Sequence, residues 1–152
     1  LTSCLRRHHM PKAHSIRANQ VRQMRDLLSS GGVLMTFPDH DMGPQRSVWV
    51  DFMGVPTATC PAFMKLARIS NAQCLPAYFL HQDQQPTLTF QAPVVFDDDA
   101  KAAATWLNHW LEDIIAQAPA EYFWVHRLFK SQPKGTPCPY AEPEAFDAQN
   151  GS

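Results

Sequence analysis

The sequence is poor in charge and has no long apolar run, and both shortages narrow the kinds of protein it can encode. Asp, Glu, Lys and Arg make up 18% of its 152 residues, against roughly 25% in an average soluble protein. Aromatic residues reach 11%, more than a disordered chain carries, so we expect a folded middle region. No apolar stretch approaches the roughly 18 residues of a spanning helix, and neither such a helix nor a signal peptide is predicted.

Several motifs that would identify a chemistry are also missing. The cysteines contain no Cys-x-x-Cys pair, so neither a zinc site nor a disulfide framework is predicted, and we expect reduced thiols. Gly-rich phosphate loops, Gly-x-Ser-x-Gly elbows and His-Glu-x-x-His motifs are absent, which removes the usual evidence for hydride transfer, nucleotide hydrolysis and zinc proteolysis. The sequence therefore predicts no metal site and no cofactor.

The near-neutral formal charge of −1 conceals a basic N-terminal stretch. Six Lys or Arg residues precede the first acidic residue, namely Arg6, Arg7, Lys12, Arg17, Arg22 and Arg25. Such a stretch contacts phosphates of lipid or nucleic acid, or is only a solvated segment, and the sequence leaves both open. No nucleic-acid partner is predicted, because the total charge is not basic and no base-reading motif is present.

The first half of the chain is predicted to contain two helices and two strands. Apolar residues recur at helical spacing over 18–30, and a glycine pair follows as a C-cap. The continuous apolar run 33–37 is typical of a buried strand, and the alternating run 47–52 indicates a second. The stretch 53–60 is predicted as turn, and a helix running to about residue 71, capped by Thr59, is expected next.

The second half is predicted to form a hairpin and a long helix. The apolar runs 73–81 and 87–96 are separated by a polar turn, which favours two paired strands. Three aspartates and a later proline mark the two ends of a helix over 100–117. The segment 131–152 is rich in Pro and Gly and has no periodicity, so we expect a mobile tail.

This order of elements predicts an α/β protein with helices packed on a mixed β-sheet. We expect one domain over residues 17–130, with a basic flanking segment over 1–16 and the tail over 131–152. Chemistry in such sheets gathers in the loops that leave the strands. The loop after residue 37 is therefore the first place to look for a site.

That loop carries two carboxylates, an imidazole and a guanidinium. Asp39 and Asp41 are two positions apart, so in an extended segment their side chains point the same way, with His40 opposite. Two carboxylates at this spacing can bind a cation, orient a hydroxyl or accept hydrogen bonds from an arginine, but they also occur in ordinary polar turns. Gly43 adds conformational freedom, and Arg46 offers a fork for phosphate or carboxylate. His40 is a candidate general base, without an identifiable orienting partner.

A second candidate surface lies in the segment EYFWVHRLFK. Trp124, His126 and Arg127 combine an aromatic anchor with basic tips, a combination that suits contact with lipid headgroups. A partly buried packing segment has the same composition. The sequence leaves both interpretations open.

Three strings taken together resemble one protein family. IRANQVRQMRDLLSSGG, FPDHDMGPQRSVWVDFMGVPTATC and APAEYFWVHRLFKSQPKGTPCPY occur in this order, and they resemble the C-terminal half of bacterial lipid A biosynthesis acyltransferases, within the lysophospholipid acyltransferase superfamily. The similarity runs from about residue 17 to residue 140. It implies a partial lysophospholipid acyltransferase-like fold, with Asp39, Asp41, Gly43, Arg17 and Arg46 in the substrate-binding wall.

The resemblance also implies a reaction and a cellular location. A fatty acyl chain would pass from acyl carrier protein to a hydroxyl of a lipid A precursor, at the cytoplasmic face of the bacterial inner membrane. Trp124, His126 and Arg127 would contact the membrane or the acceptor. We expect no cofactor. Members of the family usually begin with a hydrophobic anchor, which we expect to be missing here.

One departure concerns the family's catalytic signature, a histidine followed five positions later by Asp or Glu. The residues five positions after the seven histidines are Ala13, His14, Asn19, Gln45, Pro86, Ile114 and Ser131, and none is acidic. We therefore expect a fragment that lacks the catalytic base and is inactive alone. A non-catalytic module that binds lipid or a partner protein is the alternative.

Overall fold

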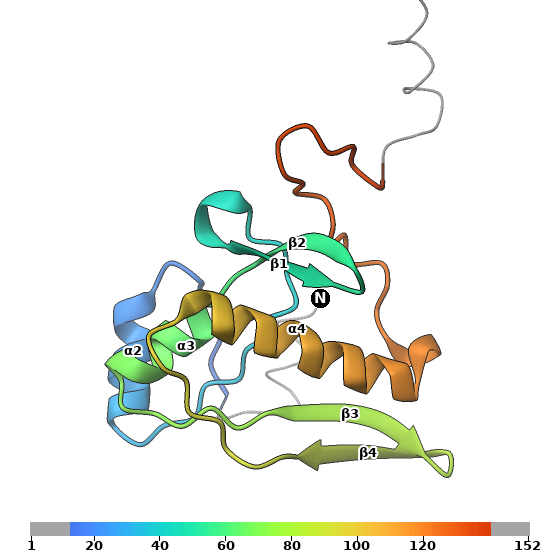
Figure 1. Ribbon diagram of the computed structural model, residues 1–152. Coiled ribbons are helices and arrows are strands. Elements are labelled where there is room, and N and C mark those ends of the chain that lie inside the picture. Colours follow the sequence, from blue (N-terminus) through green and yellow to red (C-terminus); the bar gives the residue numbers. More distant parts are fainter. Residues whose placement is uncertain (1–12, 141–152) are drawn as a thin grey trace, which may run out of the picture.

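The computed structural model describes residues 13–140. Within this range the chain forms three α-helices and two β-hairpins (Figure 1). The helices are α2 (Val21–Ser29), α3 (Ala62–Ile69) and α4 (Ala100–Gln117). The strands are β1 (Val48–Phe52), β2 (Val55–Thr59), β3 (Ala77–Gln82) and β4 (Gln85–Phe90), and the short 3-10 helices are η1 (Pro44–Arg46) and η2 (Pro119–Glu121).

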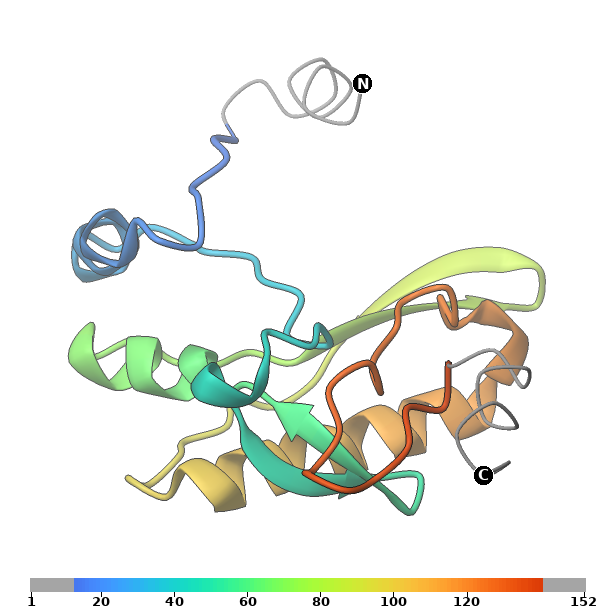
Figure 2. The same cartoon turned by 90° about the horizontal axis from the view of Figure 1, so that it is seen from above.

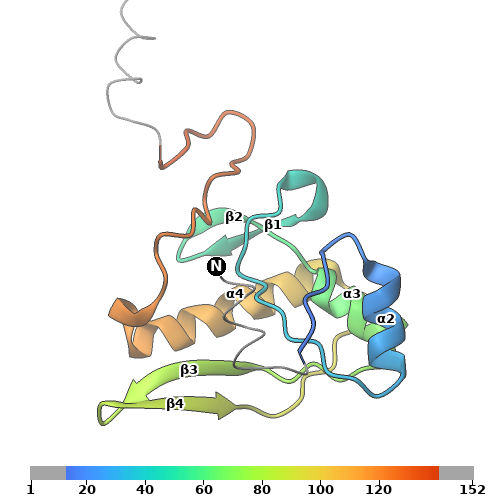
Figure 3. The same cartoon turned by 180° about the vertical axis from the view of Figure 1, so that it is seen from behind.

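Helix α4 is the centre of the arrangement. Figures 1 and 3 show it lying between the β1–β2 hairpin and the β3–β4 hairpin. Helix α3 lies near its N-terminal end, and α2 lies on the far side of α3 (Figure 2). The helix begins because the Asp99 side chain accepts hydrogen bonds from the backbone N–H groups of Lys101 and Ala102, both at 2.9 Å, as an N-cap does. It ends at Gln117, two residues before Pro119.

The β1–β2 hairpin rests on α4 along one edge. Its two-residue turn has Met53 at φ 51° and Gly54 at φ 77°, which is the left-handed pair of a type I′ hairpin turn. The Glu112 carboxylate accepts from the backbone N–H of Met53. One turn earlier on the helix, the Asn108 amide donates to the Asp51 carbonyl at 2.8 Å. Side chains of α4 thus pair with backbone groups at the turn and at the open edge of β1.

The segment that follows β4 contacts the same helix through aromatic and polar side chains, and the β3–β4 hairpin itself is hydrogen-bonded to η2. Trp106 packs edge-on against Phe96, and Trp110 donates its indole N–H to Gln91 at 2.6 Å. Near the far end, the Glu121 carboxylate accepts from the backbone N–H of His81 at 3.0 Å. This hydrogen bond lowers the pKa of Glu121, and a hydrogen bond with the His81 side chain lowers it further.

The buried core lies between α4 and the first hairpin. Phe52, Ile115 and Leu128 form a cluster, against which Leu111 and Phe129 pack. Because Leu128 belongs to the segment after η2, this cluster also fixes the chain that follows α4. Burying each large apolar side chain stabilises the fold by about 1.5–3 kcal/mol.

The α/β class, the β3–β4 hairpin and helix α4 confirm the sequence predictions. The strands, however, form two separate antiparallel sheets, β1–β2 and β3–β4, instead of one mixed sheet. The strand predicted over 33–37 is absent: its residues pair with no described strand, and Val33 is 89% exposed. Figure 2 shows this segment running as an open connection from α2 to the rest of the molecule.

Two further predictions are corrected at β2. The stretch 53–60, predicted as turn, contains this strand, and Thr59 lies in it instead of capping a helix. Helix α3 begins later, at Ala62, with Pro61 at its N-cap. The Thr59 hydroxyl donates instead to Asn108 at 3.1 Å.

The ends of the chain are described in part. Residues 131–140 of the predicted tail form no helix or strand, and Ser131 and Tyr140 make hydrogen bonds with the folded region. The remainder of the tail, and residues 1–12 of the predicted basic flank, lie outside the described residues. Among residues 13–140, no helix combines the length and the apolar character needed to cross a bilayer.

Candidate functional site

A polar cleft lies where the loop before η1 meets the segment after η2. Its volume is about 230 Å³. The residues that line it are Asp39, His40, Asp41, Val125, His126, Arg127, Leu128 and Lys130. The fold therefore brings together the two sequence regions that were separately predicted to carry chemistry.

Asp41 holds the two walls of this polar cleft together. Its side chain is 8% exposed. One carboxylate oxygen accepts from the backbone N–H of Gly43 at 2.7 Å and from the Ser131 hydroxyl at 3.0 Å. The other accepts from the backbone N–H of Ser131 at 2.7 Å. Gly43, at φ 84°, supplies the left-handed backbone that turns its N–H toward this carboxylate.

Asp39 faces a different set of groups. The Tyr122 hydroxyl donates to one of its carboxylate oxygens at 3.3 Å. Burial of the phenol, reinforced by the charge of Asp39, raises the pKa of Tyr122 far above its usual value. The phenol therefore keeps its proton and serves as a donor. The second carboxylate oxygen of Asp39 lies 3.6 Å from the His40 ring nitrogen Nδ1.

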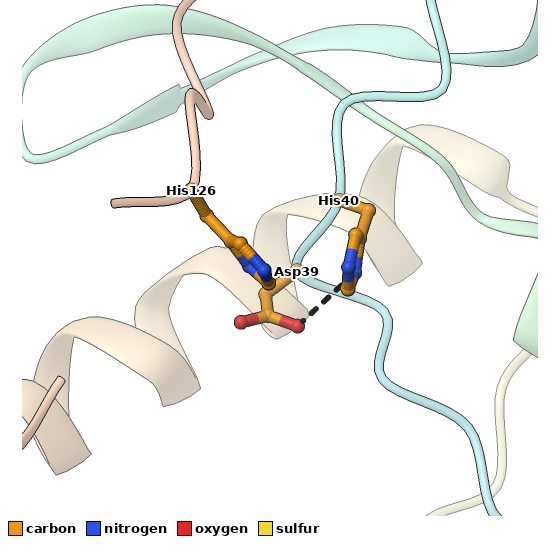
Figure 4. A group of neighbouring side chains, drawn as sticks. All are labelled: Asp39, His40 and His126. Atoms are coloured by element: carbon orange, nitrogen blue, oxygen red, sulfur yellow. Dashed lines mark ion pairs between the residues drawn. The ribbon is translucent and has the colours of Figure 1, made fainter. Parts of the chain in front are cut away.

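Two imidazoles meet beside Asp39. The ring centres of His40 and His126 are 4.4 Å apart, and Figure 4 shows the two rings and the Asp39 carboxylate converging from two separate segments. The Phe123 ring packs edge-on against His126, at 4.7 Å between centres. His40 Nδ1 also lies 3.2 Å from the Phe37 carbonyl. His40 is therefore oriented by a residue of its own loop as well as by the segment that carries His126.

The cationic groups of the polar cleft lie on its C-terminal wall. Arg127 and Lys130 both line it, and the Arg127 guanidinium packs over the Tyr140 ring at 5.7 Å. Carboxylate, imidazole and guanidinium groups in one open cleft suit an anionic or hydroxyl-bearing ligand, because each can donate to or accept from it.

Four predicted site residues lie outside this arrangement or at its edge. Arg17 precedes α2 and Arg46 ends η1; both are exposed and neither lines the polar cleft. Trp124 is half-exposed and donates its indole N–H to the Pro119 carbonyl at 2.7 Å. Gly43 contacts the site through its bond to Asp41. Among the predicted residues, Asp39, His40, Asp41, His126 and Arg127 are brought together.

Three residues of the site were missed from the sequence. Tyr122 and Ser131 bind the two aspartates, and Lys130 lines the polar cleft. Tyr122 and Lys130 lie in the segment EYFWVHRLFK that was predicted as a candidate surface, and Ser131 follows it directly, but the sequence analysis gave none of the three a role. Nothing in the local sequence indicates that they face residues 39 and 41.

Comparison with known proteins identifies relatives of one kind. A model of the bacterial lipid A biosynthesis acyltransferase family matches residues 5–131. The lipid A biosynthesis lauroyltransferase of Escherichia coli is 35% identical over 127 residues, which are 79% of this chain and 41% of that protein. A lipid A biosynthesis acyltransferase of Haemophilus influenzae is 27% identical, over 82% of this chain and 39% of the relative. The E. coli myristoyltransferase is 29% identical, over 72% and 35%.

The geometry alone defines an α/β protein with a polar cleft between two loop segments. The family model adds to this description, because the residues that it matches include both walls of the cleft. The chain belongs to the bacterial lipid A biosynthesis acyltransferase family. It spans about two fifths of the length of the curated relatives it matches.

Proposed function

We propose that this chain supplies the substrate-binding wall of a lipid A acyltransferase. The reaction is transfer of a fatty acyl chain from acyl carrier protein to a hydroxyl of a lipid A precursor. The main support is the family match over residues 5–131, which includes every residue that lines the polar cleft. The proposed location is the cytoplasmic face of the bacterial inner membrane.

The groups of the polar cleft suit the acceptor side of this reaction. Asp39 is positioned to accept a hydrogen bond from an acceptor hydroxyl, while Arg127 and Lys130 offer positive charge to phosphate or sugar acid groups. Asp41 contributes by holding the two walls, since its oxygens are engaged by Gly43 and Ser131. The exposed guanidinium groups of Arg17 and Arg46 are proposed as outer anchors for acid groups.

The segment before the polar cleft is suited to contact with lipid. Phe123, Trp124 and Val125 are 58%, 48% and 77% exposed, and aromatic side chains of this kind favour the interface between water and lipid. His126 and Arg127 follow directly and bring polar tips to the same surface. We therefore propose that this segment faces the membrane or the acyl chain of the acceptor.

The base of the reaction is proposed to lie outside this chain. In the mechanism that the family resemblance implies, a histidine oriented by an acidic residue takes the proton of the acceptor hydroxyl, which then attacks the thioester. None of the seven histidines here has an acidic residue five positions later. His40 is the alternative base, since it lies beside Asp39.

The isolated chain is expected to show no acyl transfer above background. An assay with an acyl carrier protein thioester and a lipid A precursor, monitored by mass spectrometry of the product, measures this. Turnover that disappears in His40→Ala would contradict the prediction and would identify His40 as the base. The non-catalytic lipid-binding alternative makes a different prediction. The chain would then sediment with anionic vesicles in a salt-sensitive way, and a longer protein that includes this chain would also show no turnover.

A chimera tests the substrate-binding role itself. Replacing the matching segment of the E. coli lauroyltransferase by this chain is expected to give a protein that transfers acyl groups. In that protein Asp39→Asn is expected to lower kcat/KM about tenfold, which corresponds to one lost charge-assisted hydrogen bond of about 1.4 kcal/mol. Asp26→Asn, an exposed position on α2 paired with Arg25, is the matched control and should leave kcat/KM unchanged. Equal activity of both variants would exclude Asp39 from substrate binding.

A further inference from the structure

The group formed by Asp39, His40 and His126 offers three metal-ligating side chains to one point. Their ligand atoms all lie within 4.8 Å of one another. Two of them come from the loop before η1 and the third from the segment after η2, and Figure 4 shows all three directed to a common space. The polar cleft opens beside them, so a ligand from solvent has access.

We propose that Asp39, His40 and His126 form a binding site for a divalent transition-metal ion. Two imidazoles and one carboxylate are the ligand set of many three-residue sites for Zn²⁺ and Fe²⁺, which leave further positions open to water or a substrate. Mg²⁺ and Ca²⁺ are disfavoured because they prefer oxygen ligands, and the nearby Asp41 carboxylate is engaged by Gly43 and Ser131.

The hydrogen-bonding state of His126 supports this assignment. Its Nδ1 atom is buried and has no hydrogen-bond partner among the described residues, an arrangement that costs about 1–3 kcal/mol when nothing satisfies it. A bound cation, or a water on that cation, would satisfy this nitrogen. The Phe123 ring already fixes the plane of the imidazole by packing edge-on against it.

The geometry needs only a small contraction to bind an ion. Ligand atoms around a tetrahedral ion at about 2.1 Å lie roughly 3.4 Å apart, and His40 Nδ1 is already 3.6 Å from Asp39. The His40 side chain is 49% exposed, so an ion can reach its ring, and binding through Nδ1 would replace the contact of this nitrogen with the Phe37 carbonyl. Tyr122 donates to the remaining oxygen of Asp39, which orients the carboxylate as outer-shell partners of metal sites do.

Two cationic side chains beside the proposed metal site affect which ligand fills the open positions of the metal ion. Arg127 and Lys130 line the polar cleft, and their charge opposes a bare dication but favours an anion at its open positions. The ligand class is therefore a divalent transition metal together with a small anion or hydroxide. The proposal contrasts with the sequence analysis, which predicted no metal site because the sequence contains no Cys-x-x-Cys pair and no His-Glu-x-x-His motif.

Calorimetric titration of the full chain with Zn²⁺ tests the proposal. One equivalent is expected to bind, with the affinity reduced at least tenfold in His40→Gln and in His126→Ala. His40→Gln is the more informative variant because His40 is half-exposed and its loss does not remove a packed side chain. His109→Ala, at an exposed position on α4, and the double variant His8→Ala/His9→Ala are controls that should keep the site. Unchanged affinity in His40→Gln, or no stoichiometric binding by the parent chain, would overturn the proposal.

Substitution of Co²⁺ for Zn²⁺ identifies the ligands without an activity assay. Imidazole and carboxylate ligands are expected to give visible d–d absorption that is lost in His40→Gln, with no sulfur-to-cobalt band in the near ultraviolet. A strong near-ultraviolet band would assign the metal to cysteine and refute the site. Because neither measurement involves acyl transfer, its outcome is independent of the proposed function.

Discussion

Asp41→Asn is expected to lower the free energy of unfolding by about 2–4 kcal/mol, because it removes the charge from a carboxylate that accepts three hydrogen bonds. The donors are the Gly43 N–H, the Ser131 N–H and the Ser131 hydroxyl. An asparagine keeps one acceptor oxygen and turns an NH₂ group toward the donors on the other side. At least one backbone N–H is then left without a partner in a site that is 8% exposed.

Urea unfolding followed by circular dichroism measures this change. Asp26→Asn serves as the control, since Asp26 pairs with Arg25 at the surface and exposed pairs contribute only about 0–1 kcal/mol. Ser131→Ala should have a smaller effect than Asp41→Asn, because the backbone N–H of Ser131 remains. Equal stability of the two aspartate variants would show that Asp41 does not hold the walls of the polar cleft together.

Local signals explain which parts of the fold were predictable. The ends of α4 were found because an aspartate cap and a proline act on their own neighbours in the sequence. The β3–β4 hairpin was found because its turn lies between two apolar runs. β2 was missed because Pro56 and Gly54 are typical of turns, and its strand character depends on pairing with β1. The strand over 33–37 was predicted from its apolar character alone. An apolar run indicates burial but does not provide a neighbouring strand to pair with, and this segment has none among the described residues.

Residues on both sides of the candidate site were predictable, but the contact between the two sides was not. Asp39, Asp41 and His40 were selected because three polar side chains cluster in one loop. That His126 lies beside His40, and Ser131 beside Asp41, depends on how α4 and the Leu128 contact return the chain to that loop. The expected paired carboxylates also separate into two roles, because Tyr122 binds Asp39 while Ser131 and Gly43 bind Asp41. Such partners have no signature in the local sequence.

Asn108→Ala is expected to lower the free energy of unfolding by about 2–5 kcal/mol, because Asn108 joins α4 to both strands of the first hairpin. Its side chain is 3% exposed. The oxygen accepts from the Thr59 hydroxyl at 3.1 Å, and the NH₂ group donates to the Asp51 carbonyl at 2.8 Å. Alanine would leave the buried Thr59 hydroxyl and the partly buried Asp51 carbonyl without this partner.

The Asp51 carbonyl depends on Asn108 because of the hairpin register. The two-residue turn makes Phe52 and Val55 the hydrogen-bonded pair, so Asp51 and Pro56 form the next, non-hydrogen-bonded pair. Pro56 is tolerated there since its missing N–H would point away from β1. For the same reason the Asp51 carbonyl points to the open edge of β1, where Asn108 is the donor.

Urea unfolding of Asn108→Ala beside His109→Ala isolates this contribution. His109 is the next residue on α4 but is exposed, and alanine favours a helix, so its replacement should change stability by no more than about 0.5 kcal/mol. Thr59→Val removes only the hydroxyl and should account for a minor part of the Asn108 effect. A loss as small in Asn108→Ala as in His109→Ala would mean that water satisfies the Asp51 carbonyl. Packing around Phe52 and the hydrogen bond of Glu112 with Met53 would then keep the hairpin on α4.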